Sequence, residues 1–115
     1  MRKDFILIMV LVLVSFGVAF SEEVKTIKGE VVDLSCYIAE GERGDTHKDC
    51  AIACIKAGEP AGILEEKTGK VYLVVTDDHS NPAPKVLPYV AKTAEVTGTI
   101  SERGGVTTIA IKTIK

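Results

Sequence analysis

The hydrophobic pattern of the chain changes character after its first twenty residues. A nearly continuous apolar stretch comes first, and short β-branched runs follow, separated by glycines, prolines and charged turns. Alternating or continuous apolar runs of this length predict β-strands. Five strands are expected, at residues 24–34, 61–64, 70–75, 94–101 and 106–114. The sequence "ERGG" at 102–105 predicts a hairpin turn, because paired glycines supply the positive backbone angles of tight turns.

The order of these strands predicts a mainly β fold, a five-stranded OB-fold-like barrel. Gly29 and Gly98 lie within the first and fourth strands, where a glycine lets a strand coil sharply enough to close a barrel. Pro84 and Pro88 restrict residues 81–92 to a helical turn. Five strands with a helical turn between the third and fourth is the OB-fold arrangement. Another small β sandwich or open barrel is the alternative.

Residues 35–60 do not have a strand pattern and are expected to form an insertion between strands 1 and 2. Thr46, followed three residues later by Asp49, resembles a capping box, and Gly58 gives a stop signal. We therefore expect a short helix over residues 47–57.

The first 21 residues predict a secretory signal peptide. Two basic residues precede an apolar run at residues 5–20, and Ala19 and Ser21 are small residues next to the expected cleavage point. One domain at residues 22–115 would then be exported to the periplasm or the extracellular space. The alternative is an uncleaved inner-membrane anchor at residues 5–20, since the run approaches the ~20 residues that span a bilayer.

Composition excludes several function classes. Removing Arg2, Lys3 and Asp4 from the totals of 14 basic and 16 acidic residues leaves 12 and 15. This acidic balance disfavours nucleic acid as a partner. The sequence also has no Ser-His-Asp arrangement, phosphate loop or paired catalytic carboxylates. A binding module is therefore expected rather than an enzyme.

The three cysteines give the chain its candidate chemistry. Three is an odd number, so in an exported protein at least one thiol cannot join an intramolecular disulfide. On a helix, His47, Cys50 and Cys54 would share one face within about 60°. With Cys36 they have the composition of a tetrahedral site for a transition metal, zinc or copper(I).

The spacing of these ligands limits the prediction. His47 and Cys54 are seven residues apart, a rise of about 10.5 Å on a regular helix. His47 would therefore join the cysteines only if the first helical turn relaxes. His79, in the loop "TDDHSNP", is expected to be the substitute ligand otherwise.

Two other functions remain open for the same residues. A disulfide from Cys36 to Cys50 or Cys54 would make the chain a stapled protein- or peptide-interaction module. A thiol redox or electron-transfer role is the third hypothesis, because a helix dipole favours a thiolate at Cys50. The chain has no Cys-x-x-Cys motif, which argues against the redox role.

Five segments carry a resemblance to known proteins: "GEVVDLSCY", "HKDCAIAC", "GEPAGIL", "HSNP" and "VTGTISERGG". With them the chain resembles small exported bacterial proteins that have an OB-fold-like barrel and a Cys/His-bearing insertion, mostly uncharacterised. The resemblance implies a fold and an export route, and no activity. The leading hypothesis is an exported module that holds a metal ion in a structural, sensing or transfer role, the last with another exported protein as partner.

Overall fold

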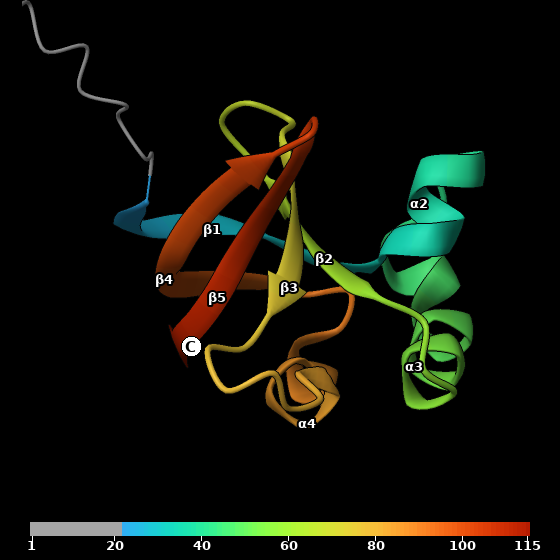
Figure 1. The fold of residues 1–115 in the computed structure, drawn as a ribbon. Helices are drawn as coiled ribbons and strands as arrows, with labels where there is room; N and C mark the ends of the chain where they lie inside the picture. Colours follow the sequence, from blue (N-terminus) through green and yellow to red (C-terminus); the bar gives the residue numbers. More distant parts are fainter. Residues whose placement is uncertain (1–21) are drawn as a thin grey trace, which may run out of the picture.

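Five strands close into a barrel that forms the body of the protein (Figure 1). The computed structural model describes residues 22–115, so the expected signal peptide and the alternative anchor lie outside the described residues. The strands are β1 (Glu23–Asp33), β2 (Ala61–Glu65), β3 (Val71–Val75), β4 (Thr93–Arg103) and β5 (Val106–Ile114). Around the barrel they follow the order β1-β2-β3-β5-β4, with β3 and β5 parallel and the other neighbours antiparallel. This is the OB-fold order, which confirms the predicted fold class.

The two strand glycines lie where backbones approach most closely. A Cβ atom on Gly29 would collide with the carbonyl group of Leu64 on β2, and one on Gly98 with the carbonyl group of Ala110 on β5. The register of β4 against β5 also shifts next to Gly98. Because only glycine fits such an approach, these positions let β1 and β4 curve around the barrel.

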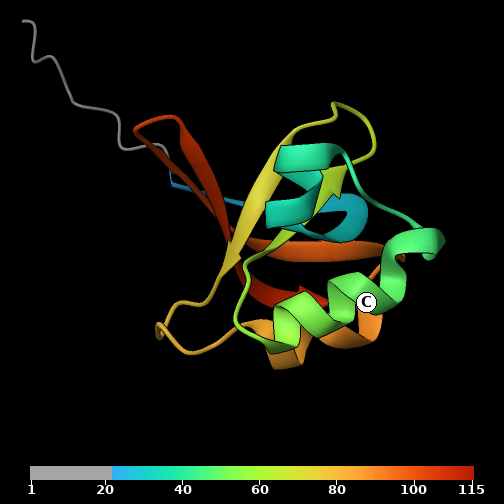
Figure 2. The same ribbon diagram turned by 90° about the vertical axis from the view of Figure 1, so that its right-hand side faces the viewer.

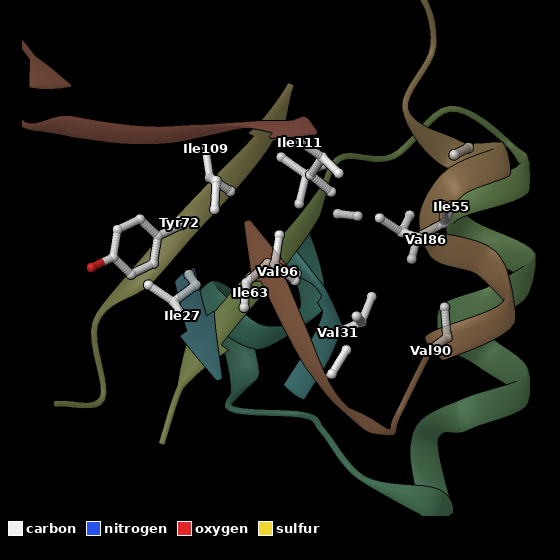
Figure 3. Packing of buried hydrophobic residues seen from close by; sticks show 14 of the residues in the cluster. Ile27, Val31, Ile55, Ile63, Tyr72, Val86, Val90, Val96, Ile109 and Ile111 are labelled. Carbon is white, nitrogen blue, oxygen red and sulfur yellow. The ribbon is translucent and has the colours of Figure 1, made fainter. Parts of the chain in front are cut away.

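The core of the barrel is almost entirely aliphatic. Figure 3 shows side chains from several strands meeting in its interior, among them Val31, Ile63, Val96 and Ile109, all fully buried. Tyr72 is the single aromatic residue in the buried cluster of the described chain. The alternation of buried and exposed residues along β4 reproduces the pattern that predicted this strand.

Short helices cover one end of the barrel (Figure 2). The helices are α2 (Leu34–Glu40), α3 (Lys48–Lys56) and α4 (Ala83–Val86), and 3₁₀ turns occupy Asp45–His47 and Leu87–Tyr89. Ile55 of α3 and Val86 of α4 point into the core at this end (Figure 3). Within residues 22–115, none of these helices has the length and apolar character needed to cross a membrane.

The expected insertion between strands 1 and 2 is confirmed, with two differences in detail. The helix predicted at 47–57 begins at Lys48, and Thr46 lies in the preceding 3₁₀ turn instead of capping the helix. His47 becomes the N-cap residue and makes no capping hydrogen bond through its side chain. The second difference is α2, which the sequence pattern did not predict.

Candidate metal centre

The junction between β1 and α2 places Asp33 next to Cys36. Asp33 is the last residue of β1 and the N-cap of α2, where its Oδ1 atom accepts a hydrogen bond of 3.1 Å from the backbone N–H of Ser35. Cys36 is the third residue of the helix. The side chains at the N-cap and at the third helical position face each other across the first turn, as they do in a capping box. The sequence Asp-x-x-Cys at this junction therefore brings a carboxylate and a thiol together.

The loop after α2 brings His47 to the same place. Glu30, on β1, accepts a 2.8 Å hydrogen bond from the backbone N–H of Gly44 and pairs with Arg43 at 3.0 Å. Gly44 has a φ of 78°, which few other residues adopt, and its carbonyl group accepts a 3.0 Å hydrogen bond from the N–H of His47. The 3₁₀ turn is thus fixed to the barrel, and the side chain of His47 is only 11% exposed.

Asp33, Cys36 and His47 form a compact cluster of potential metal ligands. One donor atom from each residue lies within 4.8 Å of the donor atoms of the other two. Zinc bonds of about 2.0–2.3 Å in a tetrahedral arrangement put the ligand atoms about 3.3–3.8 Å apart. Because no two of these donor atoms are more than 4.8 Å apart, they would need to approach one another by at most about 1–1.5 Å to share an ion.

Two atoms of this cluster are buried without a hydrogen-bonding partner. They are Oδ2 of Asp33 and Nε2 of His47, and no other buried side-chain oxygen or nitrogen of the described chain is in this state. Leaving a buried polar atom without a partner costs about 1–3 kcal/mol. Asp33 and His47 therefore each keep one buried donor atom that the rest of the described chain leaves without a partner.

The other ring nitrogen of His47 faces a carboxylate. Nδ1 lies 3.9 Å from Oε2 of Glu42. Histidine ligands of metal ions commonly direct their second nitrogen to a carboxylate, which fixes the ring orientation and increases the basicity of the binding nitrogen. The arrangement leaves Nε2, the atom without a partner, to bind an ion.

Cys54 approaches the cluster from α3. Burial raises the pKa of its thiol, and so do the neighbouring Asp33 carboxylate and Cys50. The pKa of Cys36 is raised to about 12, chiefly because the Asp33 carboxylate attracts the proton of the neutral thiol, and further by burial, by the charge of Asp33 and by the other two cysteines. The thiols are close to Asp33, although none satisfies Oδ2 with hydrogen-bond geometry.

The state of the three thiols bears on the two alternative functions, a thiol redox role and a disulfide-stapled module. A redox or exchange enzyme needs a thiolate near neutral pH, and the raised pKa values of Cys36 and Cys54 favour the neutral thiol. All three cysteines have free thiols: Cys36 and Cys54 are half-buried, and Cys50 is exposed. A bound cation would reverse the electrostatic effect of Asp33, because it stabilises a coordinating thiolate.

The predicted ligands therefore divide into three groups. Cys36 and His47 belong to the 4.8 Å cluster, Cys54 and Cys50 lie beside it, and His79 is outside it. His79 is an exposed residue of the loop after β3, with a φ of 60°. The relaxed first turn that His47 required is present as the 3₁₀ turn Asp45–His47.

Sequence reasoning missed Asp33. The signal was available in "VVDLSC", where an aspartate follows two apolar strand residues and precedes a cysteine by three positions. An aspartate at the end of a strand is usually a solvated cap or turn residue. Asp33 is instead 1% exposed, because β1, α2 and α3 meet around it.

Comparison of the chain with known protein families, with curated protein sequences and with solved structures gives no match, so the interpretation of this centre depends on its own geometry.

Proposed function

We propose that this protein is an exported, non-enzymatic module that binds a zinc ion through Asp33, Cys36 and His47, with Cys54 as the fourth ligand. The observation that carries the proposal is the pair of buried atoms without partners, Asp33 Oδ2 and His47 Nε2, beside the Cys36 thiol. A cation held between them would satisfy both atoms at once. Export is proposed from the signal-peptide pattern of residues 1–21.

The mixture of donor atoms favours zinc over copper(I). Carboxylate oxygen, imidazole nitrogen and thiolate sulfur are the three ligand types that zinc accepts at a tetrahedral site. Copper(I) prefers soft sulfur ligands, and a site that uses Asp33 gives it a poor match. Copper(I) would instead recruit Cys36, Cys50 and Cys54, which lie close enough together to affect one another electrostatically.

Metal content provides the direct test. Protein purified without chelator is expected to contain about one zinc per chain, measured by elemental mass spectrometry. Cys36→Ser and Asp33→Asn should each lower the affinity for zinc by at least about tenfold. The asparagine of the second variant retains a side-chain oxygen for the helix cap, so the substitution removes the charge and keeps the local fold.

The two histidines provide a matched control. His47→Ala should lose zinc, whereas His79→Ala should retain it, because His79 is exposed and lies outside the cluster. Loss of zinc from the His79 variant alone, or a wild-type protein that binds no zinc when the ion is added, would refute the proposed site. A higher occupancy by copper(I) than by zinc in a competition experiment would refute the choice of metal.

A further inference from the structure

Cys50 is one donor more than a tetrahedral ion requires. Asp33, Cys36, His47 and Cys54 already supply four ligands, which is the usual number for a closed zinc site. Cys50 differs from these residues in being exposed, while Cys36 and Cys54 are half-buried and Asp33 is 1% exposed. The donor atoms therefore extend from a buried carboxylate to a thiol at the protein surface.

The geometry of α3 places Cys50 beside Cys54, the proposed fourth ligand. Cys50 and Cys54 are four residues apart in this helix, so they lie on one face, one turn from each other. Helical side chains lean towards the N-terminus, which directs Cys54 back towards Cys50. Both residues also lie close enough to Cys36 to change the electrostatic environment of its thiol.

A spare donor at the open edge of a site has a kinetic consequence. A zinc ion in a tetrahedral site can accept a fifth ligand for a short time, and a donor already beside the ion makes this step easier. Such a donor allows the bonds to be exchanged one at a time, without a stage at which the ion has too few ligands.

We infer that Cys50 is the exchange ligand through which zinc enters and leaves the centre, and that the protein passes zinc to thiol- or imidazole-bearing acceptors. The inference rests on the proposed function. In the exchange step a zinc–sulfur bond to Cys50 forms while the bond to one inner ligand breaks. The Cys50 proton passes to solvent, the displaced ligand keeps its electron pair, and the zinc ion keeps its oxidation state. The acceptor then binds the ion beside Cys50 and displaces the remaining ligands in turn.

The rate of zinc transfer to a chromophoric chelator, 4-(2-pyridylazo)resorcinol, tests this role. Wild-type protein loaded with zinc should transfer the ion at a rate that increases with chelator concentration. Cys50→Ser should bind one zinc and transfer it about tenfold more slowly, which corresponds to a barrier higher by about 1.4 kcal/mol. Its rate should depend only weakly on chelator concentration, because the ion must first leave the inner ligands by itself.

Ala53→Ser is the matched control, since it introduces a serine at another exposed position of α3. This variant should transfer zinc at the wild-type rate. Equal rates for all three proteins would overturn the exchange role while leaving the zinc site intact. Loss of zinc from Cys50→Ser would also overturn the exchange role, because Cys50 would then be one of the ligands that hold the bound ion. If the wild-type protein binds no zinc, the proposed function itself fails.

Discussion

At the scale of single residues, Asp33 and Asp78 show how differently two carboxylates can be surrounded in one small domain. Asp78 lies in an exposed loop and accepts hydrogen bonds from the Ser80 hydroxyl at 2.6 Å and from the Ser80 backbone N–H at 3.1 Å. Asp33 is buried, accepts one bond through Oδ1 and has no partner for Oδ2. Both donors bind Oδ1 of Asp78, and the rest of that exposed carboxylate is open to solvent. Oδ2 of Asp33 is buried and has neither a hydrogen-bonding partner nor access to solvent.

The donors around Asp78 lower its pKa from 3.8 to about 2, with the Ser80 hydroxyl as the largest cause. We predict that Ser80→Ala raises this pKa part of the way back, because the backbone N–H remains. Carboxyl carbon chemical shifts followed against pH by NMR would measure it. A pKa that stays near 2 in the variant would contradict the assignment.

The same shift sets the sign of a pH effect on stability. The folded-state pKa lies below the ordinary value, so the interaction stabilises the folded protein above pH 3.8 and is lost as the pH falls towards 2. Ser80→Ala should therefore begin to unfold in acid at a slightly higher pH than the wild type. Asp77→Ala, in the same exposed loop, is the control that should leave the pKa of Asp78 near its wild-type value.

Some residues of the candidate site could be recognised from the sequence, and others could not. Cys36 and the cysteines of α3 were recognisable because the chain has only three thiols, and thiols have few roles in a chain that carries a signal-peptide pattern. Asp33 could not be chosen among the many acidic residues, because its importance comes from burial between segments that the sequence does not show to be neighbours. The position of His47 depended on whether its turn would be α-helical or 3₁₀, a difference that the local sequence does not decide.

At the scale of elements, the loop between α2 and α3 determines where His47 lies. Glu30 holds this loop with both carboxylate oxygens, one on the Gly44 N–H and one on Arg43. Its side chain is 12% exposed, whereas that of Arg43 is 54% exposed. The backbone hydrogen bond is therefore the better protected of the two contacts.

We predict that Glu30→Ala loosens this loop and weakens zinc binding by about tenfold, the effect expected when a support of a metal ligand is lost. Amide hydrogen exchange at Gly44 should accelerate in the same variant, since its N–H loses an acceptor. Competition with a chelator would measure the affinity.

Arg43→Gln is the comparison variant for the Glu30 clamp, the pair of contacts that Glu30 makes with Gly44 and Arg43. It removes a half-exposed ion pair worth about 0.2–1 kcal/mol and leaves the hydrogen bond to Gly44 in place. Zinc affinity should fall by a few-fold at most. If Glu30→Ala and Arg43→Gln behave alike in both measurements, the clamp does not position His47.

Local signals explain which elements could be predicted. Each strand had a clear apolar pattern, and the "GG" of the last hairpin adopts φ values of 59° and 81°. Helix α2 escaped prediction because it is seven residues long and contains no buried residue, so it has no apolar face to recognise. Its two end signals, Asp33 and Gly41, are visible only once the helix is known.

At the scale of the whole molecule, closure of the barrel depends on close backbone approach at Gly29 and Gly98. A methyl group at either position would meet a carbonyl group of the adjacent strand. Backbone atoms in a sheet cannot move aside as a flexible side chain can. The overall topology was predictable because these glycines occur where the OB-fold needs them.

We predict that Gly98→Ala lowers the free energy of unfolding by about 1–3 kcal/mol, the range found for overpacked interiors. Urea denaturation followed by circular dichroism would measure it. Lys112→Ala, at an exposed position of β5, should change the value by no more than about 0.5 kcal/mol. A Gly98 variant as stable as the Lys112 variant would show that the strands have room there.

Asp33 at the end of β1 pairs with Ala61 at the start of β2, so the insertion begins and ends on neighbouring strands. The Leu34 N–H donates a 2.9 Å hydrogen bond to the Pro60 carbonyl group, so the segment departs from and rejoins the barrel at a single point. Ala51 and Ile55 of α3 pack into the core, so only the parts of the insertion outside these contacts can change in length without disturbing the barrel. Substitutions in those parts, with Asp33 and the core contacts kept, can therefore alter the proposed zinc site on the same barrel.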